Sequence, residues 1–135
     1  MSSSVIAVDT SALIAIVLNE PERDQFLACI APCEQALISN ATLMEARLVV
    51  FGKQKQFGYQ LLEQLLSNRT FKVVTQDKDE MDIAYEAFLI YGKGNHHKAQ
   101  LNFGDLFSYA LAKSRGIPLL YKGEDFALTD IVSAV

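Results

Sequence analysis

Tryptophan is absent from this chain of 135 residues, and cysteine and proline are scarce, with two and three residues. The two cysteines, Cys29 and Cys33, are too few for the disulfide framework of a small secreted protein, so we expect reduced thiols. Three prolines and seven glycines exclude collagen-like and linker-rich chains. The remainder is 50% apolar and 21% charged, which is typical of a globular protein. We therefore expect one compact domain over residues 1–135.

Basic residues are also fewer than acidic ones, and long apolar runs are absent. The chain has 12 Lys and Arg against 16 Asp and Glu, a net charge of −4. Proteins that hold nucleic acid by overall charge are usually basic, so any nucleic-acid activity must come from a local site. No basic residue precedes the apolar N-terminal stretch, and its run from Thr10 to Asn19 is far shorter than the roughly 20 residues of a membrane span. We expect a cytoplasmic protein without membrane association.

Short aliphatic runs alternate with helical segments along the chain. Strands are expected at 5–8, 36–39, 71–74 and 119–121, with an edge strand in the last residues, and helices at 10–18, 21–30, 41–51, 58–68, 77–91 and 102–115. We expect Thr10 and Ser11 to cap the first helix, and the helix at 41–51 to stop near Gly52. This alternation predicts an α/β fold with a central, mostly parallel sheet and helices on both faces.

Four acidic residues stand out by their positions. Asp9 and Asp125 each follow a predicted strand, and Asp105 opens a helix. Ligands bind at the carboxyl ends of the strands in open α/β sheets. Glu45 has mostly apolar neighbours three and four residues away, so its carboxylate lies on an apolar stripe and its burial needs compensation. The four acids predict a carboxylate cluster, whose mutual repulsion a divalent cation removes.

Each acid also has an ordinary structural explanation. These are an N-cap for Asp9, a capping pair with Asn102 for Asp105, a turn residue or the cap of a short helix for Asp125, and a helix-edge position beside Arg47 for Glu45. A cluster has a chemical use, because oxygen ligands select Mg²⁺ or Mn²⁺ over zinc. Mg²⁺ keeps bound waters, one of which can attack a phosphodiester.

Several short motifs surround these acids. They are DTSAL at 9–13, ATLMEA at 41–46, NFGD at 102–105 with YALAK at 109–113, and KGEDF at 122–126 followed by TDI at 129–131. In this order and over nearly the whole chain, they resemble the PIN-domain ribonucleases, and within them the VapC toxins of bacterial type II toxin–antitoxin modules. The resemblance implies a single PIN domain with a three-layer fold. It also implies metal-dependent hydrolysis of RNA, with 5′-phosphate and 3′-hydroxyl products.

The resemblance also implies roles for individual residues, with Mg²⁺ or Mn²⁺ as cofactor. The catalytic and metal-binding roles fall on the family's four acids, which are Asp9, Glu45, Asp105 and Asp125. The supporting positions are Thr10, Ser11 and Asn102, each of which helix capping explains equally well. The candidate RNA backbone contacts are Lys93, His97, Lys98 and Lys122. His96 and His97 have no further ligands at hand for a zinc site.

The implied partners are RNA and a VapB-like antitoxin, in a homodimer or a heteromer with the antitoxin. The apolar helices at 10–18 and 41–51 are candidate walls of an antitoxin groove. A phosphatase with Asp9 as nucleophile is disfavoured, because that chemistry needs a second acid where Ser11 stands. The alternative function is a PIN-like module that binds RNA or protein without cutting. Retention of all four acids argues against it, because idle carboxylates repel one another at a net cost.

Overall fold

The computed structural model describes residues 4–135. One sheet has the strand order β3-β2-β1-β4, formed by β1 (Val5–Val8), β2 (Gln35–Ser39), β3 (Phe71–Val74) and β4 (Leu119–Leu120). Every strand pair in it is parallel, which confirms the predicted α/β sheet. The expected edge strand at the end of the chain is reduced to a single bridge between Leu119 and Ser133.

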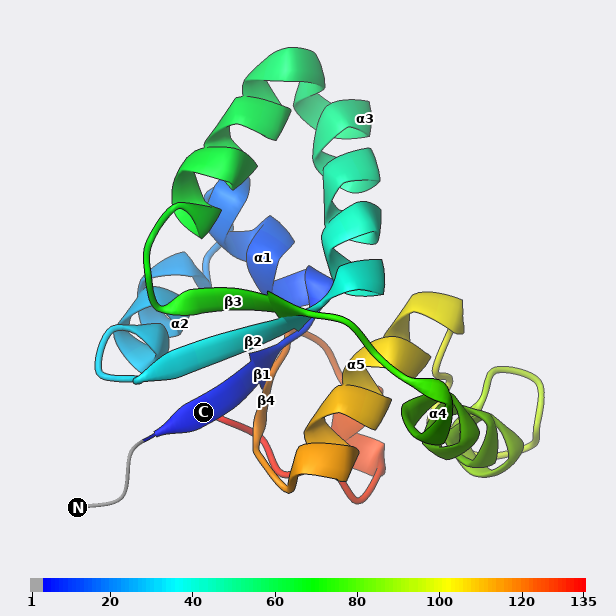
Figure 1. Cartoon of the computed structure of the whole chain (residues 1–135). Helices are drawn as coiled ribbons and strands as arrows, with labels where there is room; N and C mark the ends of the chain where they lie inside the picture. Colours follow the sequence, from blue (N-terminus) through cyan, green and yellow to red (C-terminus); the bar gives the residue numbers. More distant parts are fainter. Residues whose placement is uncertain (1–3) are drawn as a thin grey trace.

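The helices cover both faces of this sheet, as Figure 1 shows. They are α1 (Thr10–Val17), α2 (Arg23–Ile30), α3 (Asn40–Leu66), α4 (Lys78–Tyr91) and α5 (Phe103–Arg115), followed by the 3₁₀ turn η1 (Phe126–Leu128). Because strand side chains alternate, Ile6 and Val8 join the apolar core under α1–α3, whereas Ala7 joins the core under α4 and α5. This arrangement confirms the three layers. Among the described residues, no helix is long and apolar enough to cross a membrane.

α3 contains the predicted pair of helices as two arms that join without a loop. The chain stays helical through Gly52 and breaks at Lys55, whose φ is 53°, so that two arms fold back on each other (Figure 1). The arms meet closely at Gly58, where an added Cβ would lie 2.5 Å from the carbonyl oxygen of Val50. The first arm thus ends three residues after the expected stop at Gly52. Glycine at position 58 permits the close approach, and the positive φ of Lys55 is strained for a residue with a Cβ.

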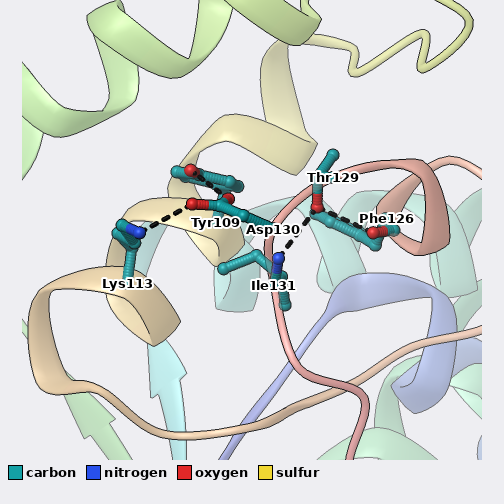
Figure 2. A network of polar contacts seen from close by, with 6 residues as sticks. All are labelled: Tyr109, Lys113, Phe126, Thr129, Asp130 and Ile131. Atoms are coloured by element: carbon teal, nitrogen blue, oxygen red, sulfur yellow. Dashed lines mark hydrogen bonds and ion pairs between the residues drawn. The ribbon is translucent and has the colours of Figure 1, made fainter.

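A polar network fastens the end of the chain to α5, as Figure 2 shows. The Asp130 carboxylate accepts hydrogen bonds from the Tyr109 hydroxyl and the Lys113 ammonium, both at 2.6 Å. Partial burial alone would raise the pKa of Asp130, but these two donors outweigh it and hold the pKa below its usual value. Thr129 donates to the carbonyl oxygen of Phe126 at 2.7 Å and closes the turn that precedes the network. The later part of the segment after β4 is thus held against α5.

The bend in α3 gives a test of this fold. Lys55→Gly should raise the free energy of unfolding by about 1 kcal/mol, because glycine adopts a positive φ without a Cβ clash. Lys53→Gly is the matched control, two residues earlier in ordinary helix, and should lower it by about 1 kcal/mol. Urea denaturation followed by circular dichroism measures both. A similar loss in the two variants would show that the chain has no strained bend at Lys55.

Candidate active site

Asp9 lies at the carboxyl end of β1 and is only 2% exposed. One carboxylate oxygen accepts hydrogen bonds from the Ser11 amide at 3.0 Å and the Ser11 hydroxyl at 2.7 Å, so Asp9, not Thr10 or Ser11, is the N-cap of α1. The other oxygen accepts from the Ser108 hydroxyl of α5 at 2.5 Å. Within residues 4–135, no Lys or Arg pairs with Asp9. The capping explanation is therefore correct for Asp9, and it leaves the charge of this carboxylate unneutralised.

Glu45 reaches the same region from the first arm of α3. Its carboxylate accepts a hydrogen bond from the Thr10 hydroxyl at 2.5 Å. It also lies directly against Gly104 in the first turn of α5, where a Cβ would overlap the carboxylate. Arg47 instead pairs with Glu63 of the second arm at 3.0 Å, so the helix-edge explanation beside Arg47 does not describe Glu45. We did not single out Gly104 in the sequence, although the NFGD motif contains it.

Asp105 joins α5 to the other acids. It forms the predicted capping box with Asn102, in which each side chain accepts a hydrogen bond from the other residue's backbone amide at 2.9 Å. Partial burial is the main cause that raises the pKa of Asp105 to about 7. The bond from the Asn102 amide opposes this rise, and the negative charges of Asp9, Glu45 and Asp125 add to it. Asp105 therefore lies within the electrostatic reach of the other three predicted acids.

Asp125 completes this set from the segment after β4. It occupies the N-cap position of η1, but its side chain makes no capping hydrogen bond and is exposed. Two residues earlier, Gly123 has a φ of 104°, a conformation that favours glycine. The cap explanation thus accounts for the position of Asp125 in the chain and not for its side chain.

The donors in this region are oxygens, which suit a hard divalent cation such as Mg²⁺ or Mn²⁺. In the described part of the chain, no three Asp, Glu, His or Cys side chains stand close enough together to hold a metal ion. The oxygens of Asp9, Glu45 and Asp105 are instead bonded to the serine and threonine hydroxyls and to the backbone amides described above. The oxygen ligands therefore fit such an ion in their chemistry. The carboxylates that carry them lie farther apart than the ligands of one bound metal ion.

The predicted RNA contacts fall into two groups. Lys93 and Lys98 are exposed on the segment between α4 and α5. Lys122, in contrast, pairs with Glu20 at 2.9 Å and Glu22 at 3.3 Å. These ion pairs engage its ammonium group within the protein, which does not favour the prediction of an RNA contact for Lys122.

The histidines lie on the same segment between α4 and α5. The Nδ1 atom of His97 accepts a hydrogen bond from the Ala99 amide at 2.9 Å, and its ring packs edge-on against Tyr91. His96 is exposed with a φ of 62°. His97 therefore helps to shape this segment, and neither histidine belongs to a metal-binding group within residues 4–135.

Comparison with known proteins identifies the family of this chain. The PIN domain family model matches residues 6–132. Ribonuclease VapC30 of Mycobacterium tuberculosis is 41% identical over 128 residues, which cover 95% of this chain and 97% of that protein. Ribonuclease VapC of Mycolicibacterium smegmatis is 40% identical, with 95% and 98% covered.

Solved structures share the fold. The crystal structure of Mycobacterium tuberculosis VapC20, described as a sarcin-ricin loop cleaving toxin, aligns with a TM-score of 0.76 at 19% identity, covering 94% of this chain and 96% of that one. A toxin–antitoxin complex from Klebsiella pneumoniae aligns at 0.69 with 25% identity, covering 98% of each chain. This chain belongs to the PIN domain family and, within it, to the VapC group.

Proposed function

We propose that the chain is a single PIN domain that acts in the cytoplasm as a ribonuclease toxin of a type II toxin–antitoxin system. Its catalytic acids are Asp9, Glu45, Asp105 and Asp125. The observation that carries this proposal is that four carboxylates from four separate segments have no Lys or Arg partner within residues 4–135. Burial is the main cause that raises the pKa of Asp105 to about 7, and the charges of the other three acids add to it. The relatives named as VapC ribonucleases support the same activity. A module that only binds RNA or protein would gain nothing from the repulsion among these charges.

The proposed cofactor is Mg²⁺ or Mn²⁺, held by Asp9, Asp105 and Asp125, with Glu45 as a further ligand or a group beside it. When bound, such an ion makes a water molecule more acidic and stabilises the charge that develops on the phosphate and on the leaving 3′ oxygen. The chain's own contribution is to bring negative oxygens to one place. A cation held there would account for the attraction of a polyanion such as RNA by a protein whose overall charge is negative.

Other polar residues orient these acids. Ser11 and Ser108 fix the two oxygens of Asp9. Thr10 holds Glu45 in the same way, and the Asn102 capping box fixes the direction of Asp105. Ser108 was not among the residues predicted from the sequence, where it is one polar residue in an apolar helix. Lys93, Lys98 and His97 stay proposed RNA backbone contacts, since their segment leads directly into α5.

The proposed partner is a VapB-like antitoxin, in a homodimer or a heteromer with the chain. The expected groove wall at α1 stays a prediction, although most of the apolar side chains of α1 are buried in the core. Exposed apolar side chains lie instead on the first arm of α3 and the start of α5. A hollow of about 410 Å³ beside Glu45 is lined by Met44, Leu48, Phe103 and Phe107. This hollow suits an apolar antitoxin segment with a basic side chain directed at the acids.

The first prediction concerns activity. The purified chain should cleave RNA when Mg²⁺ or Mn²⁺ is present, and EDTA should stop the cleavage. The cleavage rate of Asp105→Asn should be at least about a hundredfold lower, with an unchanged circular dichroism spectrum. Asp82→Asn, an exposed acid paired with Lys78 on α4, is the control and should keep full activity. Undiminished cleavage by Asp105→Asn in a nuclease-free preparation would refute the assignment.

The second prediction concerns the stability of the protein without metal. A carboxyl group whose folded pKa is raised destabilises the fold above that pKa, and the penalty fades as the pH falls from about 7 toward the usual value of about 4. Asp105→Asn removes the charge, so at pH 8 it should melt at or above the wild-type temperature, with the difference shrinking toward pH 5.

Metal supplies the second half of this test. Mg²⁺ should stabilise the wild type and stabilise Asp105→Asn much less, because an ion bound only by the folded state shifts the equilibrium. A purely structural cap at Asp105 predicts otherwise. The variant would then lose up to about 1 kcal/mol at pH 8, with equal metal shifts in both proteins. Thermal melts with EDTA and with metal separate the two explanations.

The third prediction concerns the antitoxin. Leu48 and Phe57 are both 62% exposed on α3, but only Leu48 lines the hollow beside Glu45. Coexpression with the small gene adjacent to that of the chain should rescue growth arrested by the wild type. Leu48→Ser should weaken toxin–antitoxin binding by about tenfold or more, whereas Phe57→Ser should leave it unchanged. Equal toxicity with and without the adjacent gene, or equal binding by both variants, would contradict this surface.

A further inference from the structure

The ammonium group of Lys122 has a role that the four acids do not explain. Lys122 lies three residues before Asp125, on the segment between β4 and η1. Its ammonium contacts Glu20 at 2.9 Å and Glu22 at 3.3 Å, on the connection between α1 and α2. These residues are about one hundred positions away in the sequence, so the ion pairs join two distant parts of the chain.

The backbone of Lys122 makes a second connection. Its amide donates to the Ser11 hydroxyl at 2.9 Å, and that hydroxyl donates to Asp9 at 2.7 Å. A continuous series of hydrogen bonds thus runs from the segment that carries Asp125 to the carboxylate of Asp9. The same residue holds this segment to α1 by its amide and to the α1–α2 connection by its side chain.

Charge and burial show what this ammonium group is suited for. Two carboxylates face one ammonium, so the local charge of the three side chains is negative and does not attract phosphate. All three side chains are about one-third exposed, and one oxygen of Glu22 is fully buried and makes no hydrogen bond. The Lys122 ammonium, 3.3 Å away, compensates the burial of this charged oxygen. Pro21, between the two glutamates, restricts the backbone that presents them.

We propose that Lys122 is a positioning residue, whose ion pairs with Glu20 and Glu22 fix the segment 121–125 and thereby set Asp125 relative to Asp9. The effect on catalysis rests on the proposed function, whereas the effect on the segment does not. Lys122 then acts through Asp125 and makes no contact with RNA. The two glutamates are equally part of this arrangement, although no sequence motif links them to Lys122.

Three variants of the full chain test this proposal, namely Lys122→Met, the double variant Glu20→Gln/Glu22→Gln, and all three changes together. The first two should each speed hydrogen exchange of the backbone amides of residues 121–126 in the metal-free protein by about two- to fivefold, the scale expected for partly exposed ion pairs. In the triple variant the exchange of these amides should be no faster than in either of the other two, because all three variants lose the same interaction. Lys122→Arg should restore slow exchange, and Lys78→Met, which breaks an exposed pair on α4, should leave this segment unchanged.

Mn²⁺ binding and cleavage of a labelled single-stranded RNA give two further measurements. The first two variants should weaken Mn²⁺ affinity by about two- to fivefold and lower kcat with KM unchanged. Unchanged exchange in Lys122→Met overturns the proposal. So does a raised KM in Lys122→Met together with a normal KM in the glutamate variant, because that pattern identifies an RNA contact. If the wild type cleaves no RNA, the proposed function fails, and the exchange rates still decide whether the segment is held by Lys122.

Discussion

Negative charge without a cationic partner is the constraint on which the proposed site depends. Asp9 sits at the end of a central strand, Glu45 and Asp105 are presented by helices from opposite faces of the sheet, and Asp125 follows the strand next to that of Asp9. Within residues 4–135, none of the four pairs with a lysine or arginine. Hydroxyl and amide donors orient the carboxylates without cancelling their charge. The first turn of α5, where Gly104 admits Glu45, adds the partial positive charge of a helix N-terminus.

Capping and catalysis are compatible at these positions. Asp9 caps α1 and Asp105 belongs to the capping box of α5, so each carboxylate has a structural use before any ligand binds. A helix cap fixes a side chain at the end of a rigid element, which is also what a catalytic group requires. For this reason the ordinary explanations of Asp9 and Asp105 are correct and do not exclude the proposed roles. Glu45 and Asp125 differ, because neither position has a structural explanation for its side chain.

Much of the fold could be predicted because it depends on local pattern. The aliphatic runs at 5–8 and 71–74, and the capping pair Asn102 and Asp105, each contain their own signal. A break between 51 and 58 was predicted, but the positive φ of Lys55 was not, because a lysine carries no local signal for that conformation. Ion pairs between residues that are distant in the sequence could not be predicted either, because no local pattern indicates them. Lys122 resembled a free phosphate contact because its partners, Glu20 and Glu22, are distant in the sequence.

The proposed function requires that the four acids form one metal centre. Crystals of the chain grown with Mn²⁺ test this directly, through the anomalous scattering of the ion. We expect a peak beside the first turn of α5, within about 2.5 Å of carboxylate oxygens from at least two of Asp9, Asp105 and Asp125. The absence of a peak there in a chain that cleaves RNA with Mn²⁺, or a peak held by other residues, would contradict the account.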